Sequence, residues 1–251
     1  MVIKSILEIL SFLTIIPVEK ISKENSLENI SINMHLFPII GLIIGISSIP
    51  ITIFSFLIFN HLISGFIITI FLIIITGIHH TDALADFADG IMVKGSKEKK
   101  YKIIHDPAIG AAGVLAMISY FIGMTITIST YTDLFRLITS LLISEIIAKY
   151  VMVLQAYCSN SAWEGYSSLF TKNMKSKKKI IASTIITIIL LILSRGEIIP
   201  IILFELFIVG AVVGFIIIFI SNRNFGGITG DVMGATNEIV RLCSMIIIQA
   251  K

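Results

Sequence analysis

Long apolar runs, separated by short polar links, dominate this sequence. A helix needs about 20 consecutive apolar residues to cross the hydrocarbon core of a bilayer. Runs near that length predict six membrane spans, at 36–59, 62–78, 107–130, 134–157, 180–194 and 199–220. The runs are continuous and do not alternate with period two, which favours helices over a β-barrel. The short link at Asn60-His61 predicts that the first two spans form a hairpin.

Two further apolar segments lie near the ends of the sequence. Residues 1–16 predict an uncleaved helix that is interfacial or half-buried, and residues 236–249 predict an amphipathic helix that lies in the interface or re-enters the bundle. The expected fold class is therefore all-α: a polytopic integral membrane helical bundle with about six transmembrane helices and interfacial helices at both termini. We expect a single membrane domain, 1–251, whose segments 79–106, 158–179 and 221–238 carry the active site.

Composition narrows the class of protein further. Of the 251 residues, 56% are hydrophobic and 14% are charged, and the mean hydropathy is +0.99. An ordinary water-soluble domain is less apolar and more highly charged, and a disordered chain has low hydrophobicity. Cys158 and Cys243 do not form a CxxC pair, so no disulfide framework is expected. The expected environment is the lipid bilayer, and no nucleic-acid partner is expected.

The basic residues predict the orientation of the bundle. Six spans place the N-terminus and the segments 79–106, 158–179 and 221–235 on one side of the membrane. That side holds Lys20 and Lys23, five lysines within 94–102, five within 172–179, and Arg223, whereas the other side has only Arg136 and Arg195. Since positive charge follows the cytoplasmic face, we expect a multi-pass cell-membrane protein with its N-terminus and large loops in the cytoplasm. Alternatively, the lysine runs bind lipid headgroups or attract an anionic substrate.

Three carboxylates are aligned just after the second span. Asp82, Asp86 and Asp89 have the spacing i, i+4, i+7, which places them in one stripe on a helix. Aligned carboxylates repel one another unless a cation or protons neutralise them. Mg²⁺ is the cation that carboxylates commonly hold against phosphates. The stripe therefore predicts metal-assisted phosphoryl or prenyl-type chemistry at the cytoplasmic membrane surface; the alternative is a solvated helix face.

His80 precedes this stripe by two residues. It is a candidate acid or base, or a partner of the aspartates, although a lone histidine is as often a packed residue of the core. We assign no function to its neighbour His79.

Two glycine-containing segments reach the same face. Asp106 and Pro107 fit the start of the third span, and Gly110 and Gly113 would allow a phosphate to approach that helix N-terminus. The alternative is a helix cap combined with close packing of small residues.

The second segment, Asn224–Glu238, contains four glycines together with Thr229, Asp231 and Glu238, which predicts a compact polar loop of functional importance.

Glu145 and Lys149 stand at i, i+4 within the fourth predicted span. They form either a structural ion pair or a substrate contact.

These motifs together resemble those of the cobalamin synthase family. The run Gly77-x-x-His80-x-Asp82-Ala-Leu-Ala-Asp86-Phe-Ala-Asp89-Gly90 is similar to the signature of that family, and the similarity covers essentially the whole chain. The other matching segments follow in the expected order: Phe12–Val18, Phe37–Gly45, Asp106–Gly110 with Gly113, Glu164-Gly165, and Gly226–Asp231 through Glu238. Two positions depart from the pattern, because the family usually has basic residues where this chain has Ile15 and Ala108.

The resemblance implies a membrane transferase of the last steps of cobalamin assembly. It would join adenosylcobinamide-GDP to α-ribazole or its 5'-phosphate and release GMP, with Mg²⁺ held by Asp82, Asp86 and Asp89. Asp82, His80 and Asp231 would be catalytic, with His80 or an aspartate accepting the hydroxyl proton. Seven residues would bind the nucleotide, Lys94 compensating for the missing basic residues: Lys94, Asp106, Gly110, Gly113, Thr229, Gly230 and Glu238.

Two alternatives remain open at this point. A CDP-alcohol phosphotransferase shares Asp86-Phe-Ala-Asp89-Gly90, but the rest of that signature is missing. A small-solute transporter would have charges at the bilayer midplane and repeated halves, and no repeat is evident. Gly41-x-x-x-Gly45 would also allow pairing of helices in a homo-oligomer.

Overall fold

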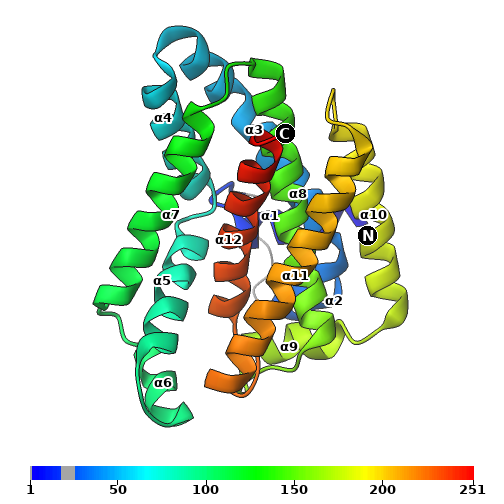
Figure 1. Ribbon diagram of the computed structural model, residues 1–251. Coiled ribbons are helices and arrows are strands. Elements are labelled where there is room, and N and C mark those ends of the chain that lie inside the picture. Colours follow the sequence, from blue (N-terminus) through cyan, green and yellow to red (C-terminus); the bar gives the residue numbers. More distant parts are fainter. Residues whose placement is uncertain (1, 18–25) are drawn as a thin grey trace.

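The computed structural model describes residues 2–17 and 26–251, and this part of the chain folds as helices joined by short links (Figure 1). Within it no strand forms, and Ser161 and Ile228 make one isolated bridge. In chain order the helices are α1 (Val2–Leu13), α2 (Ser26–Ile32), the 3-10 turn η1 (Met34–Leu36), α3 (Phe37–Ile58), α4 (His61–Ile75), α5 (His79–Met92), α6 (Lys97–Ile104), α7 (Ala111–Ser129), α8 (Leu134–Cys158), α9 (Tyr166–Asn173), α10 (Lys177–Ser194), α11 (Pro200–Asn224) and α12 (Gly230–Gln249).

The helices define an all-α polytopic membrane protein. Four stretches are long and apolar enough to cross a bilayer: Met34–Ile58, α7, α8 and α11. Helices α4 and α5 are together long and apolar enough for a fifth span, but the chain bends by 88° between them. Helix α10, which was predicted as a span at 180–194, is not among these stretches, because three of its 18 residues are lysines at its start. Large apolar side chains on the outer helices point away from the bundle, among them Leu115, Leu193 and Phe219, as expected for surfaces that face lipid.

The predicted hairpin of the first two spans is confirmed. Asn60 caps α4 by accepting a hydrogen bond from the N–H of Ile63, at 3.0 Å. The hydroxyl of Ser64 on α4 donates to the carbonyl oxygen of Ser55 on α3, at 2.8 Å. The tight link and this bond hold the two helices side by side.

Helix α8 is the most buried helix of the bundle. The small residues of α3 allow its close approach: a Cβ atom added at Gly41 would lie 2.5 Å from the carbonyl oxygen of Glu145, and one at Gly45 would lie 2.9 Å from Leu142. The Gly41-x-x-x-Gly45 pattern therefore packs α3 against α8 within one chain. This contact occupies the surface that was considered for pairing between copies.

Helix α12 lies inside the bundle, which is the second of the two positions predicted for the C-terminal helix, and not in the interface. It begins at Gly230, six residues before the predicted start, and packs along α5, α7, α8 and α11. Its polar residues Asn237, Glu238 and Arg241 are fully buried, so α12 brings charge into the centre of the protein. By contrast, α1 is half-buried as predicted, with Ile9, Leu10 and other residues covered.

The segments that were predicted to share one face do lie at one end of the bundle. Figure 1 shows α6, α9 and the junction of α11 and α12 together at the lower end of the view. The lysine-rich parts of the chain are thus gathered around the start of α12. Lys20, Lys23 and Val18, which entered the sequence argument, lie outside the described residues.

Candidate functional site

The three predicted carboxylates lie on α5 and become progressively more buried along it. Asp82 is exposed, Asp86 is half-buried and Asp89 is buried. The predicted acidic helix is therefore confirmed, but its three carboxylates have different surroundings.

Asp89 serves as the N-terminal cap of α7. Its carboxylate oxygens accept hydrogen bonds from the N–H groups of Gly110, at 2.7 Å, and Gly113, at 2.9 Å. The negative charge also lies at the positive end of the helix dipole. Both glycines were predicted to let a phosphate approach, and in the structure they let the Asp89 carboxylate approach instead. Binding of a phosphate at this helix end stays a prediction.

The start of α7 corrects the prediction for the third span. The helix begins at Ala111, with Gly110 at the cap position, and not at Pro107. Asp106 caps no helix, since its side chain accepts a hydrogen bond from the N–H of Ala108, at 2.9 Å, within an exposed turn. Asp106 and Ala108 thus lie on the surface just outside the cap that Asp89 provides.

Replacing Gly113 by alanine is expected to destabilise the protein. The added Cβ would lie 2.5 Å from a carboxylate oxygen of Asp89, so the cap must shift or break. Overpacking of this kind costs about 1–3 kcal/mol. Thermal unfolding in detergent should show a lower midpoint for Gly113→Ala. Gly230→Ala, also at a helix start but with open space around the added Cβ, should leave the midpoint unchanged; equal midpoints for both variants would contradict the role of the cap.

Helix α12 runs antiparallel to α5 and brings Asp231 to the acidic stripe. His80 lies opposite Asn237, and a Cβ added at Gly234 would lie 2.6 Å from Ala83. Continuing this pairing by one turn places Asp231 beside Asp86, and their charges influence each other. The two segments that were singled out separately therefore form one site.

Four carboxylates gather here without a lysine or arginine in ion-pair contact among the described residues. Asp82, Asp89 and Asp231 each add negative potential at Asp86, and within the described ranges none of the four forms an ion pair. Burial raises the pKa of the Asp231 carboxyl above its ordinary value, while a hydrogen bond from Thr229 offsets part of the rise. Such a group of acids is stabilised by a bound cation.

The donor atoms suit a hard cation such as Mg²⁺, although the predicted set of three ligands is not assembled. In the part of the chain that the structure describes, no three Asp, Glu, His or Cys side chains are placed to hold a metal ion. Asp89 is already engaged at α7. Mg²⁺ commonly takes only one or two protein carboxylates and completes its shell with water and phosphate oxygens, so Asp82, Asp86 and Asp231 offer enough oxygen donors.

The glycine-rich loop before α12 has a defined structure. Thr229 caps α12 by accepting from the N–H of Val232, at 3.1 Å. The loop pairs with the segment after α8, because Ile228 donates to Asn160, and Ala162 donates to Ile228, both at 2.9 Å. A Cβ added at Gly227 would lie 2.6 Å from that backbone, which explains this glycine. The pairing fixes the position of Gly230 and Asp231 at the site.

A sharp corner separates α4 from α5. Gly77 and Ile78 both have positive φ values, of 64° and 65°, and a β-branched residue rarely adopts this conformation. Ile15, one of the positions where a basic residue was expected, lies beside the corner, since its N–H donates to Ile75 at 2.9 Å. The corner places His79 and His80 in the first turn of α5.

A cavity of about 410 Å³ opens beside this first turn. Its walls are mainly apolar and come from α1, α3, α8, α9 and α12. Phe12, Met34, Phe37, Met152, Phe170 and Met233 form most of the wall, and His79, His80 and Gly230 are among the polar or small residues that complete it. The cavity thus borders the acidic group at the start of α12.

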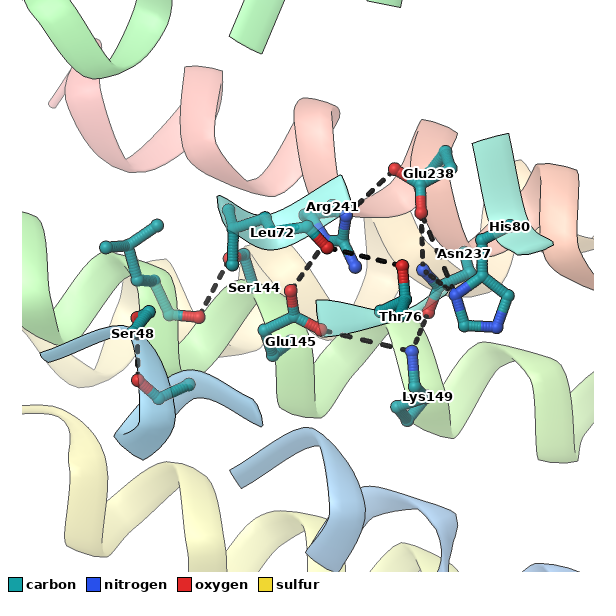
Figure 2. Close-up of polar contacts among 12 residues, drawn as sticks. Ser48, Leu72, Thr76, His80, Ser144, Glu145, Lys149, Asn237, Glu238 and Arg241 are labelled. Atoms are coloured by element: carbon teal, nitrogen blue, oxygen red, sulfur yellow. Dashed lines mark hydrogen bonds and ion pairs between the residues drawn. The ribbon is translucent and has the colours of Figure 1, made fainter. Parts of the chain in front are cut away.

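Beneath His80 lies a buried network of charged side chains (Figure 2). Arg241 contacts Glu145 at 2.7 Å and Glu238 at 2.8 Å, and Lys149 lies 3.9 Å from Glu145. The predicted pair of Glu145 and Lys149 is therefore confirmed as part of a larger structural group. Glu238, which was predicted to bind the nucleotide, has its carboxylate engaged by Arg241 and Asn237.

Lys94, which was predicted to bind the nucleotide, has different surroundings from Lys97 and Lys100 of the same segment. Lys94 is exposed, and only its carbonyl oxygen makes a contact, with Lys99. Lys100 is buried and donates to Asn224 at 2.6 Å, and the amino group of Lys97 lies against Gly226. Two lysines of α6, Lys97 and Lys100, thus approach the glycine-rich loop. The sequence analysis included them in a run of lysines but predicted no contact with this loop.

Four residues near the site were missed by the sequence analysis. His105 influences both Asp86 and Asp231, and Asn237, Arg241 and Tyr120 belong to the buried network. A buried arginine on an apolar helix is a signal that could have been used, since charges within membrane bundles are usually paired or functional. Asn237 belongs to the segment 224–238 that was singled out, although no role was given to it, and nothing in the local sequence marks His105 or Tyr120.

The fold and the group of carboxylates define a polytopic helical membrane protein with a candidate site at its lysine-rich end, and comparison with known proteins identifies its family. The family model of cobalamin-5-phosphate synthase matches residues 5–249. The chain therefore belongs to the cobalamin-5-phosphate synthase family and is a transferase of cobalamin biosynthesis.

Individual relatives match over nearly their full length. Adenosylcobinamide-GDP ribazoletransferase of Pyrococcus abyssi is 31% identical over 244 residues, which cover 96% of this chain and 95% of the relative. The proteins of the same name from Fusobacterium nucleatum and Archaeoglobus fulgidus are each 30% identical, covering 95% and 97% of this chain and 94% and 96% of their own. No solved structure matches the chain. Family membership favours the enzyme over the transporter and the CDP-alcohol phosphotransferase.

Proposed function

We propose that this protein joins adenosylcobinamide-GDP to α-ribazole or its 5'-phosphate and releases GMP. The observation that carries the proposal is the unpaired group formed by Asp82, Asp86 and Asp231, in a chain whose relatives are named for this reaction. A pyrophosphate-linked substrate brings its own negative charge to the site. A cation shared between carboxylates and phosphates compensates both sets of charges.

The bond changes are those of a phosphoryl transfer. The 3'-hydroxyl oxygen of the ribazole forms a bond to the phosphorus that carries cobinamide, and the bond from that phosphorus to the GMP oxygen breaks. Asp231 accepts the hydroxyl proton, because burial makes its carboxylate a stronger base than an ordinary aspartate. Mg²⁺, when bound, neutralises charge that develops on the phosphate oxygens. Asp82 and Asp86 would hold it, while Asp89 supports α7 beside them.

The surrounding residues suggest how the substrates are placed. Thr229 and Gly230 begin α12, whose N-terminal dipole favours a phosphate. Lys94 lies just before α6 and Lys97 is its first residue; this helix lies at the same end of the bundle (Figure 1), where the two charges would attract the nucleotide. The cavity beside His80 is large enough for a small nucleoside, because sites for drug-sized ligands begin at about 300 Å³. We therefore place the ribazole there, and the lysine-rich end in the cytoplasm.

Release of GMP tests the proposal. Purified protein in detergent is incubated with adenosylcobinamide-GDP, Mg²⁺ and either form of ribazole, and GMP is measured by chromatography. We expect GMP to form only when a ribazole is present, together with an equal amount of the joined corrinoid product. An EDTA-treated sample should form none. Folded protein that releases no GMP with either ribazole would overturn the assignment of substrates.

A further inference from the structure

The buried network determines how the side-chain amide of Asn237 is oriented. The amino group of Lys149 lies 2.7 Å from Oδ1 of Asn237, and an ammonium group can only donate hydrogen bonds. The atom that faces it must therefore be the amide oxygen. This contact excludes the flipped amide, in which two donors would face each other.

With that orientation, the amide nitrogen of Asn237 points at Glu238 and His80. It donates to Oε1 of Glu238, at 3.1 Å, and it lies 3.4 Å from Nδ1 of His80, so that its second hydrogen is available to this ring nitrogen. A proton on Nδ1 would face the hydrogens of this NH₂ group, and two donors cannot form a hydrogen bond. The other nearby oxygen, Oε1 of Glu238, is 3.8 Å from Nδ1, which is beyond hydrogen-bond distance.

His80 therefore carries its single proton on Nε2. A second proton would have to sit on Nδ1, where it would face the NH₂ group of Asn237. Figure 2 shows Nε2, the ring nitrogen without a dashed line, pointing away from the network. Among the described residues Nε2 has no hydrogen-bond partner. The ring lines the cavity between α1, α9 and α12.

We propose that His80 is a hydrogen-bond donor to the ligand in this cavity, held in the Nε2–H form by the chain Glu145, Lys149, Asn237, and that it is not the general base of the transfer. The inference rests on the proposed function for the identity of the ligand. It adds the chemistry that the cavity selects: a largely apolar body with a hydrogen-bond acceptor, such as an unprotonated ring nitrogen or a ribose oxygen. A ligand that offers only a donor at this point is disfavoured.

Two substitutions of His80 separate donation from proton removal. The amide nitrogen of glutamine reaches the place of Nε2 and can donate, whereas that of asparagine reaches only the place of Nδ1. We expect His80→Gln to keep GMP release within about tenfold of the wild type, and His80→Asn to lose about a hundredfold, the usual effect of removing a donor from a reacting ligand. A general base predicts the opposite for His80→Gln, since an amide accepts no proton.

Asn237→Asp tests the network that holds the ring. A carboxylate at 237 can accept from Nδ1–H, which would move the proton to Nδ1 and leave Nε2 as an acceptor. We expect this variant to fold and to lose GMP release about as strongly as His80→Asn. A pair of Asp and His should instead maintain or increase the rate if His80 were the base. Asn60→Asp is the matched control, because aspartate caps α4 as well as asparagine does.

Nitrogen NMR of histidine-labelled protein reads the proton position directly and needs no activity. The chain has five histidines, and the signals of His80 are those absent from His80→Gln. We expect a protonated Nε2 and an unprotonated Nδ1 in the wild type, and the reverse in Asn237→Asp. A wild-type proton on Nδ1 would overturn the inference. If the wild type releases no GMP, the proposed function fails, while the NMR result still decides the state of His80.

Discussion

Replacing Asp82 or Asp86 by asparagine is expected to lower GMP release by about a hundredfold or more. Each substitution keeps the shape of the side chain and removes one negative charge from the group around Asp86. Because charge stabilisation by a bound metal contributes several kcal/mol to a transition state, the loss of a ligand should act on turnover more than on folding. Initial rates at saturating substrates and a series of Mg²⁺ concentrations measure this effect.

A matched control distinguishes the site from a general effect of lost charge. Asp133→Asn removes an exposed carboxylate at the start of α8, where asparagine caps the helix equally well. This variant should keep the wild-type rate and thermal midpoint. If Asp82→Asn and Asp86→Asn also keep the wild-type rate, the carboxylates of α5 do not take part in the reaction.

Replacing Arg241 by methionine is expected to cost about 3–5 kcal/mol of stability, because it leaves buried carboxylates without their cation. Arg241 is fully buried and contacts Glu145, Glu238 and the hydroxyl of Tyr120. The thermal midpoint in detergent and the yield of folded protein should both fall. A second substitution, Glu145→Gln in the Arg241→Met protein, should recover part of the loss, since one unpaired charge is then removed.

Arg223→Met is the control for this experiment. Arg223 lies exposed near the end of α11, so the same substitution there should change the midpoint little. If the two arginine variants unfold at the same temperature, the buried network contributes nothing to stability, and the positioning of α12 against α8 must come from packing alone.

The spans could be predicted from sequence because each depends on a local property, the length of an apolar run. Their boundaries were less predictable where a distant residue determines them. The start of α7 at Ala111 depends on Asp89, which is 21 residues before Gly110 in the chain. The local sequence assigned the capping of this helix to Asp106, which has the right residue type but lies in an exposed turn before the helix.

Helix α12 shows a second reason for error. Four glycines in 226–234 predict a loop, yet the helix already begins at Gly230 and contains Gly234. Gly234 is small because Ala83 of α5 approaches there, and this reason exists only in the folded protein. The pattern of residues was recognised correctly, but its cause is packing between two helices that lie far apart in the sequence.

The candidate site was predicted in parts. The acidic stripe on α5 and Asp231 were both identified, since carboxylates at helical spacing and in a glycine-rich loop are visible in the sequence. Their meeting depends on the antiparallel packing of α5 and α12, and so does the contact of His80 with Asn237. Sequence alone left His80 open as an acid, a base or a core residue, because its role depends on a neighbour 157 positions away.

Direct binding of a divalent cation is the measurement that tests the central claim most closely. Mn²⁺, which can replace Mg²⁺ at oxygen ligands, is titrated into the detergent-purified protein while the free ion is followed by electron paramagnetic resonance. We predict a saturable site in the wild type and in Asp133→Asn, with binding strongly weakened in the Asp82→Asn/Asp86→Asn double variant. Equal binding by the double variant and the wild type would contradict the assignment of the metal to the end of α5.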